Sequence, residues 1–443
     1  MASDLQMSAA FTEPSLPEVH SSVSVSRSPI YWRRLLGFLG PGFLISVGYM
    51  DPGNWATDIA GGSRFGYTLL FVIMLSNLMA ILLQSLSLKL GVATERDLAQ
   101  LCHENYGPRV SFALWIGAEI AIAACDLAEV IGSAIALNLL FHIPLFYGVL
   151  ITGLDVLLIL LLQRWGFRYI EALVIALIGT ILGMFSVQMF LSRPDYGPLL
   201  HSLFIPSPSI VTNPAMLYIA IGILGATVMP HNLYLHSSIV QSRRYKRTPE
   251  GKREAIHLAN VDSALALTVA LFVNAGILIV AAAVFHRSGH FEVAAIEDAY
   301  KLLSPLLGAA GASTLFAIAL LASGQNSSIT GTLAGQVVME GFIHLKVSPW
   351  LRRLITRSLA IIPTIIVVAV NGEQGTEKLL ILSQVILSLQ LSFAVVPLVL
   401  FTGSRKKMGE FVNGRWLQGL GWTTAGVIAG LNGWLLIETA LGR

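Results

Sequence analysis

The sequence predicts an all-α membrane protein of about eleven transmembrane helices, in which two sets of five form an inverted repeat and one helix is added at the end. Three observations support this fold class. Of the 443 residues, 55% are hydrophobic and only 12% are charged, whereas a soluble domain has about a quarter charged residues. Basic residues gather in alternate loops between the apolar segments. Two apolar segments are interrupted by matching polar sequences that contain proline.

Segments of about 17–25 apolar residues are interpreted as transmembrane helices. They lie near residues 35–61, 68–91, 111–141, 147–163, 169–191, 213–241, 259–285, 312–343, 353–370, 379–402 and 418–440. The Ser- and Pro-rich residues 1–32 predict a disordered cytoplasmic N-terminal tail, and they lack the apolar core of a signal peptide. The transmembrane domain then covers 33–443, with the first repeat at 33–192, the inverted second repeat at 212–403 and the extra helix at 418–440.

The distribution of Lys and Arg predicts the orientation. If the N-terminus is cytoplasmic, 22 of the 28 basic residues fall on the cytoplasmic side. The six on the other side are Arg64, Arg193, Arg287, Lys301, Lys378 and Arg443. Because cytoplasmic loops of membrane proteins carry an excess of Lys and Arg, we expect a multi-pass protein of the cell membrane. Its N-terminus would be cytoplasmic and its C-terminus extracellular or periplasmic.

The two interrupted segments are the first and sixth predicted helices, and their polar residues fall near the centre of the bilayer. Residues 48–55 read GYMDPGNW and residues 226–232 read ATVMPHN. The sixth predicted helix comes five membrane crossings after the first. Because five is an odd number, the two helices cross the membrane in opposite directions, as an inverted repeat requires. Paired broken helices are the best sequence indication of a transporter's binding site.

The residues at the two breaks offer a defined set of ligands. Proline has no N–H, so Pro52 leaves the carbonyl of Gly48 without its helical donor, and Pro230 does the same for Ala226. Asp51 and Asn54 add hard oxygens, and Met229 adds a soft sulfur. Calcium and magnesium prefer oxygen alone, so this set favours a first-row transition metal such as Mn²⁺ or Fe²⁺. A lone Pro-Gly kink or a lone Met is usually structural, but two matched breaks favour a site.

The same residues carry a resemblance to a known family. Asp51-Pro52-Gly53-Asn54 and Ala226-x-x-Met229-Pro230-His231 resemble the paired signatures of the Nramp metal-ion transporters. The similarity runs from about residue 35 to the C-terminus and implies a LeuT-type fold and proton-coupled uptake of divalent transition metals. It implies that Asp51, Asn54, Met229 and the Ala226 carbonyl ligate the metal, joined by the Gly48 carbonyl and Gln384 in an outward or occluded state. Ser392 departs from the proline usual in the family.

Several titratable residues are candidates for proton transfer. Glu119, Asp126 and Glu129 share one face of the third predicted helix. The resemblance implies that these acids pair with arginine along the proton route, and Arg353 is the expected partner. The alternative is an ion-pair network that only holds helices together. His231 and His236 would act in gating or proton relay, although His236 is equally well explained as a hydrogen-bonded core histidine.

The alternatives are a cation-coupled amino-acid symporter on the same fold, a Mg²⁺-transporting relative, and a receptor that uses metal structurally. The anionic Asp51 would repel a substrate carboxylate, and the Met-Pro-His sequence favours manganese or iron over magnesium. No Gly-x-x-x-x-Gly-Lys-Ser/Thr sequence is present, so an ATP-driven enzyme is not expected. We expect no cofactor, no nucleic-acid partner and no obligatory protein partner; the transported substrate would be Mn²⁺ or Fe²⁺. Cys102 and Cys125 are not expected to form a disulfide.

Overall fold

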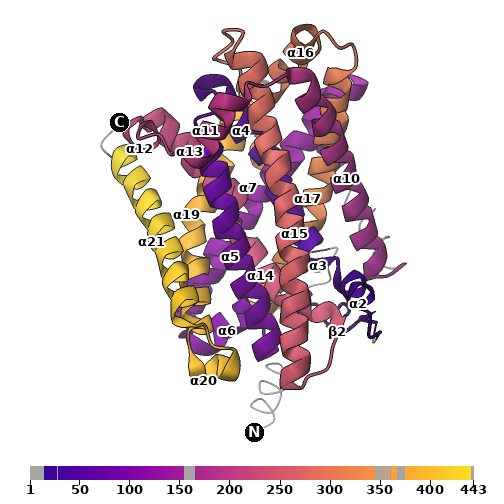
Figure 1. The fold of residues 1–443 in the computed structure, drawn as a ribbon, viewed down its shortest axis with the longest axis vertical. Coiled ribbons are helices and arrows are strands. Elements are labelled where there is room, and N and C mark those ends of the chain that lie inside the picture. The colour runs from indigo at the N-terminus through magenta and orange to yellow at the C-terminus, as the bar shows by residue number, and fades with distance from the viewer. Residues whose placement is uncertain are drawn as a thin grey trace.

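The structure is a computed structural model. It describes residues 14–26, 28–153, 165–344 and 375–440, together with Leu351, Ile355, Ser358 and residues 361–366. These residues form an all-helical bundle with a single pair of two-residue strands in the described part. Figure 1 shows α20 and β2 at one end of the bundle, which we call the N-terminal face, and α16 at the other, which we call the C-terminal face.

The first span is broken into three pieces. It consists of α3 (Pro41–Ser46), the 3₁₀ turn η1 (Val47–Met50) and α4 (Pro52–Phe65). Helix α2 (Tyr31–Phe38) precedes it and is separated from it by Leu39 and Gly40, so the span begins later than the predicted residue 35.

The sixth span is also broken. Helix α13 (Pro214–Thr227) begins at the C-terminal face, and α14 (Pro230–Ile239) continues to the N-terminal face, where it ends in the 3₁₀ turn η2 (Val240–Ser242). The first broken span runs the other way, from α3 towards the C-terminal face at α4 (Figure 1). The two breaks therefore lie in antiparallel spans, as predicted.

Unbroken helices surround these two spans. The long ones are α5 (Leu70–Thr94), α7 (Pro108–Phe141), α10 (Phe167–Ser192), α15 (Pro249–Ala281) with the π-helical η3 (Ala282–His286), α17 (Ala312–Ile343), α19 (Thr376–Thr402) and α21 (Arg415–Ala440). The short ones are α6 (Leu98–Asn105), α8 (Leu145–Thr152), α11 (Tyr196–Phe204), α12 (Ser209–Thr212), α16 (Ile296–Leu307), α20 (Arg405–Met408) and the turn η5 (Gly409–Phe411).

Seven segments of the described chain are long and apolar enough to cross a membrane. They are Leu70–Thr94, Pro108–Phe141, Phe167–Ser192, Pro214–Ser242, Pro249–His286, Thr376–Thr402 and Arg415–Ile437. The broken first span and α17 complete the described bundle. Helix α8 covers only the beginning of the predicted span 147–163, and most of the predicted span 353–370, including Arg353, lies outside the described residues.

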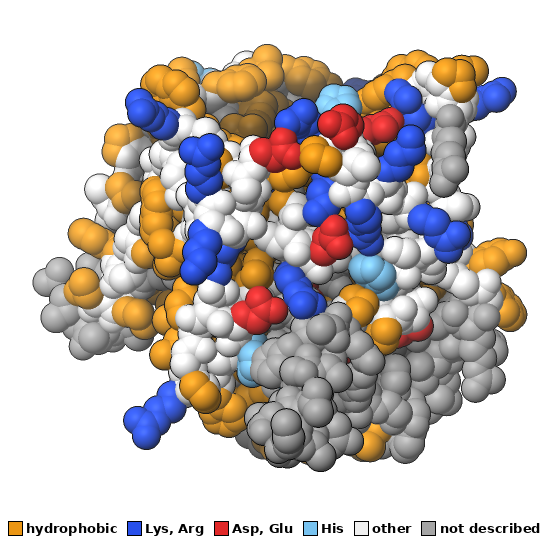
Figure 2. All heavy atoms as spheres, turned by 90° about the horizontal axis from the view of Figure 1, so that it is seen from below, with side chains coloured by type: hydrophobic (Ala, Val, Ile, Leu, Met, Phe, Trp, Pro, Cys, Tyr) orange, Lys and Arg blue, Asp and Glu red, His pale blue; other side chains and the backbone are white. Residues whose placement is uncertain are grey.

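The N-terminal face carries many basic side chains. Figure 2 shows Lys and Arg side chains spread across it among fewer Asp and Glu. The loops there include Arg243, Arg244 and Arg247 after α14, and Arg405 to Lys407 in α20. This charge distribution agrees with the alternation of basic loops in the sequence.

In the part of the N-terminal tail that the structure describes, residues 14–26, the chain packs against the bundle. The strand β1 (Val23–Ser24) pairs in parallel with β2 (Arg243–Arg244). Leu16, Val19 and Val23 are buried in the main core. No role was predicted for these three apolar residues because the segment as a whole is polar. They are three and four residues apart and pack against the same core.

Candidate functional site

The two breaks lie against each other. Asp51 has an extended backbone and begins α4, while Met229 has an extended backbone and begins α14. A methyl group placed on Gly48 would lie 3.1 Å from the Met229 sulfur and would also collide with Asn232. The glycine therefore permits the close approach of the unwound first span to the second half of the sixth. The structure thus brings Gly48, three residues before Asp51, against Met229.

Asp51 is wholly buried and has polar neighbours from two spans. Its Oδ1 accepts the backbone N–H of Asn54 at 2.9 Å, which caps the start of α4. Its Oδ2 lies 3.4 Å from Nε2 of Gln384 in α19. Gln384 is likewise buried, so the predicted ligand of the tenth span does meet the first break.

Several buried oxygens around the breaks have no hydrogen-bond partner in the described part of the chain. They are Oδ1 of Asn54, Oγ1 of Thr227, Oδ1 of Asn232 and Oε1 of Gln384. Buried polar atoms of this kind are rare in proteins and call for an explanation, such as an ion. With the Asp51 carboxylate and the Met229 sulfur, they are donors of the kinds that suit a transition metal.

Polar side chains from α15 and α17 hold the unwound backbone of the first break. Asn274 donates to the Tyr49 carbonyl at 2.7 Å, Ser327 donates to the Val47 carbonyl at 3.5 Å, and Ser323 bonds the Met50 carbonyl. These side chains satisfy backbone carbonyls that the broken helix leaves without helical donors. Their position in the middle of apolar spans was the sequence feature that could have indicated this role.

Gly53 serves a different purpose from the one its sequence suggests. Next to Pro52 it indicates further unwinding, yet it lies inside α4 in the first helical turn. A methyl group at this position would overlap the side-chain amide of Gln384 and lie 2.9 Å from its Cγ. Gly53 is therefore required for the approach of Gln384 to Asp51.

Two of the three predicted acids of α7 converge. Asp126 and Glu129 are buried, and a methyl group on Gly331 of α17 would lie 3.1 Å from Asp126 Oδ1 and 3.2 Å from Glu129 Oε1. Glu119 is only partly buried and accepts a hydrogen bond from Trp115 Nε1 at 3.1 Å. The structure thus separates a buried pair from a third, more accessible acid on the same helix.

The two predicted histidines have different surroundings in α14. His231 is buried, and its Nδ1 has no partner among the described residues. His236 Nδ1 lies 2.9 Å from Gln84 Oε1, and Gln84 Nε2 donates to the Tyr49 hydroxyl at 2.8 Å. This chain of contacts links α14 through α5 to the unwound first span.

Comparisons with known proteins agree with the fold. The family model of natural resistance-associated macrophage protein-like transporters, Nramp, matches residues 42–438. The chain belongs to the Nramp family. It is 63% identical to the divalent metal cation transporter MntH of Nostoc sp. and 61% identical to that of Mesorhizobium japonicum. The alignments cover 97% of this chain in both cases, and 97% and 95% of the relatives.

Solved structures confirm the fold. The manganese transporter of Eremococcus coleocola, in complex with an aromatic bis-isothiourea compound, superposes with a TM-score of 0.89 at 46% identity, covering 96% of this chain and 90% of that one. Mhp1, a nucleobase-cation-symport-1 family transporter, gives a TM-score of 0.58 at 13% identity, covering 90% of this chain and 92% of that one. The second likeness shows the fold alone, and it supports the predicted LeuT-type arrangement.

This Nramp chain has a polar network at its N-terminal face, which we call the clamp: the buried residues Glu171, Arg243 and Asp262, and the exposed Arg168, which pairs with Glu171. Arg243 Nη1 lies 2.8 Å from Glu171 Oε1, and its Nη2 donates to the Leu39 carbonyl at 2.7 Å. Asp262 accepts the N–H groups of Gly40 at 3.2 Å and Gly42 at 2.7 Å. The clamp therefore fixes the start of the first span to α10, α15 and β2.

The Nramp site also has a buried acid that the sequence analysis missed. Asp58 follows Asp51 by two turns of α4 and lies on nearly the same side of the helix. It is buried, and its Oδ2 has no hydrogen-bond partner among the described residues. The sequence could have indicated this residue, because a second carboxylate within the same membrane span is a candidate functional group.

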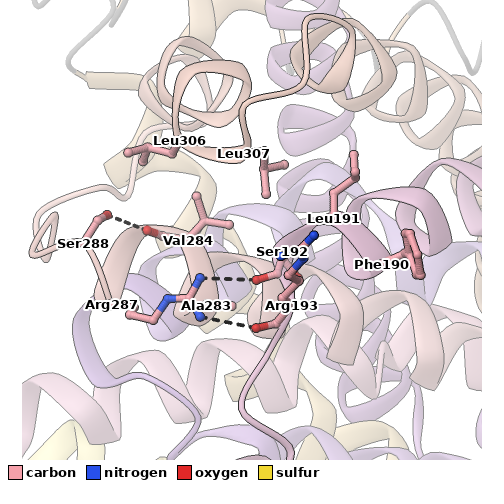
Figure 3. A pocket seen from close by; sticks show the side chains of 10 residues that line it. All are labelled: Phe190, Leu191, Ser192, Arg193, Ala283, Val284, Arg287, Ser288, Leu306 and Leu307. Carbon is pink, nitrogen blue, oxygen red and sulfur yellow. Dashed lines mark hydrogen bonds between the residues drawn. The ribbon is translucent and has the colours of Figure 1, made fainter.

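Two cavities open at the C-terminal face of the Nramp fold. One, of about 600 Å³, lies between α4, α13 and α19, and its lining residue Ile381 precedes Gln384 by one helical turn. The other, of about 440 Å³, lies between α10, η3 and α16 (Figure 3). There Arg287 donates to the carbonyls of Ser192 and Arg193. None of the predicted site residues lines either cavity, but the first is bounded by the two broken spans and by α19, the helix that carries Gln384.

Proposed function

We propose that this protein is a secondary active transporter that imports Mn²⁺ and Fe²⁺ together with protons. The observation that carries the proposal is the close approach of the two helix breaks, where Gly48, three residues before Asp51, lies against the Met229 sulfur. A hard anionic oxygen suits any divalent cation, whereas a thioether favours transition metals over Ca²⁺ and Mg²⁺. The curated relatives named as divalent metal cation transporters support the same class of substrate.

The proposed ligands are the Asp51 carboxylate, the Asn54 and Gln384 amide oxygens, the Met229 sulfur and the carbonyls of Gly48 and Ala226. Asn54, Gln384 and Met229 are buried side chains from three different helices or helix ends, and the first two have oxygens without partners. Because the ligands come from both broken spans, a rigid-body movement of either half-helix changes the site. Such a site can open to one face at a time.

The cargo would enter through the cavity between α4, α13 and α19 at the C-terminal face. This face would be outside the cell, since the basic N-terminal face suits the cytoplasm (Figure 2). On the other side of the site, α14 and the clamp close the path: Arg243 and Glu171 are wholly buried. Opening that path requires the buried pair to separate or to move as one body.

The proposed proton route starts at the buried acids of α7. Asp126 and Glu129 adjoin Gly331 of α17, the helix whose serines hold the unwound first span. A proton that moves onto or off these acids changes the charge close to that helix. His231 and the His236–Gln84–Tyr49 chain offer further titratable or hydrogen-bonding groups near the site.

The experiment is uptake into proteoliposomes at two external pH values, with internal Mn²⁺ and internal pH recorded together. We expect Mn²⁺ uptake to acidify the interior and to rise when the external pH is lowered. Excess Fe²⁺ should compete, and equal excesses of Ca²⁺ or Mg²⁺ should not. Uptake without acidification would refute proton coupling, and equal competition by all four ions would refute a transition-metal site.

A further inference from the structure

The N-terminal tail crosses the N-terminal face and joins helices that the transport function would have to separate. We call residues 14–24 the strap. Its Leu16 is 1% exposed, and Leu16 has a left-handed backbone with φ of 54°. A leucine adopts that conformation only when its surroundings enforce it. The strap is therefore held by specific contacts.

One side of the strap is bound to α6 and α17. Ser15 Oγ donates to Asp97 Oδ2 at 2.6 Å, and the backbone N–H of Leu16 donates to Glu340 Oε2 at 2.9 Å. Gln336 Nε2 contacts both Glu18 Oε1 at 3.2 Å and Glu340 Oε1 at 2.9 Å. Hydrogen bonds to carboxylates are stronger than neutral ones, so these contacts outweigh ordinary surface bonds.

The other side of the strap is bound to the end of the sixth span. The N–H of Ser21 donates to the Gln241 carbonyl at 2.9 Å, and Ser238 Oγ lies 3.5 Å from the Ser15 carbonyl. β1 then pairs with β2 directly after η2. The strap thus ties the last turn of α14, which carries Met229 at its other end, to α17, which holds the unwound first span through Ser323 and Ser327.

The chemistry of the strap is suited to reversible binding. Its apolar contacts come from only three side chains, Leu16, Val19 and Val23. Ordering about ten residues of a free tail costs conformational entropy of the same order as these contacts supply. Because the apolar contacts and the entropy cost are of similar size, the strap can be released when the helices beneath it move apart.

We propose that the strap fastens the N-terminal face closed, so that its release accompanies opening of the metal path on that side. This inference rests on the proposed alternating access, in which α14 moves relative to α17. The strap contacts both helices, so any widening of the gap between them stretches or breaks its bonds. Weakening the strap should raise the fraction of molecules open at the N-terminal face without removing any metal ligand.

The test measures accessibility in the absence of metal. A reporter cysteine, Ser237→Cys, is placed in a Cys102→Ser, Cys125→Ser background, because Ser237 is buried in α14 next to Ser238, which contacts the strap. The rate of its modification by a membrane-permeant maleimide is compared with and without Leu16→Asp, which puts a charge into the apolar contact beside Glu340. The matched control is Ser22→Asp, which adds the same charge to the strap at an exposed position.

We expect Leu16→Asp to raise the modification rate roughly tenfold, since losing one buried leucine shifts a two-state equilibrium by at least that factor. Ser22→Asp should leave it unchanged. Equal rates in all three proteins would overturn the proposal, as would equal increases in both variants. If Leu16→Asp does not fold, Leu16→Ala is used with the same criterion. Because the readout needs no metal, failure of transport and failure of the strap are distinguished.

Discussion

Substituting Gly53 by alanine has two opposing effects at the candidate site, a gain in helix propensity and a cost of overpacking. In a helix, Gly→Ala normally stabilises by about 1 kcal/mol. Here the added methyl group would overlap the amide of Gln384 and lie 2.9 Å from its Cγ. Overpacking of this kind costs about 1–3 kcal/mol, so the packing term is expected to cancel or exceed the helix term.

The larger consequence is for the metal site. Non-bonded heavy atoms settle about 3.5–4 Å apart, so the amide must move by roughly 2 Å. That movement breaks the 3.4 Å contact between Gln384 Nε2 and Asp51 Oδ2. The movement also takes the Gln384 oxygen, a proposed ligand, away from the site. Losing one interaction with a charged group costs about 1.5–3 kcal/mol, which corresponds to a loss of Mn²⁺ affinity of about tenfold or more.

The assay is Mn²⁺ binding by titration calorimetry on purified protein, with the thermal midpoint recorded for each variant. Gly183→Ala in α10 is the matched control, because a methyl group there has no neighbour within 4 Å. It should raise the thermal midpoint and leave affinity unchanged. Gly53→Ala should lower affinity and leave the midpoint unchanged or lower.

A double-substitution experiment makes the reasoning refutable. If Gly53→Ala acts through the Gln384 amide, its effect on affinity should disappear in a Gln384→Ala background. The same loss of affinity in both backgrounds would show that the methyl group acts elsewhere. Normal Mn²⁺ affinity in Gly53→Ala alone would refute the close approach of these two residues.

Three further predictions concern single residues. Met229→Ala should weaken discrimination against Ca²⁺ in competition uptake assays, and unchanged discrimination would refute the soft-ligand argument. Asp126→Asn should reduce metal-driven acidification more than Mn²⁺ binding, whereas equal losses would indicate a structural role. Burial raises the pKa of Asp97, which lies outside the spans, from 3.8 to about 6. Folded protein then binds a proton that unfolded protein has lost, so stability falls as pH rises from about 4 to 6, by roughly 3 kcal/mol. Asp97→Asn should flatten this dependence in thermal melts, and an unchanged slope would contradict it.

The fold could be predicted largely from the sequence because a bilayer restricts the possible elements. Long apolar segments have to be helices when they cross lipid, so composition and length suffice to place α5, α7 and α19. The antiparallel relation of the two broken spans followed from the parity of the spans between them. Helix α2, with its break before Pro41, was not predicted. Leu39 and Gly40, where the helix is broken, are themselves apolar, so the apolar pattern of the sequence continues across the break.

The candidate site was predicted in part. Asp51 and Met229 were identifiable because each stands beside a proline in the middle of an apolar span. Their contacts with other helices could not be derived, since a sequence does not state which faces meet. The Gly53–Gln384 approach and the bond from Asn274 to Tyr49 are examples. The strap was missed for the opposite reason, because its few apolar residues lie in a polar segment.

The most direct test of the central claim is the position of manganese itself. Crystals of the protein soaked in Mn²⁺ would be measured near the manganese absorption edge, and the anomalous difference map would locate the ion. The account predicts one strong peak between the Asp51 carboxylate and the Met229 sulfur, next to Asn54. A map with its manganese peak elsewhere, and none at the two breaks, would contradict it.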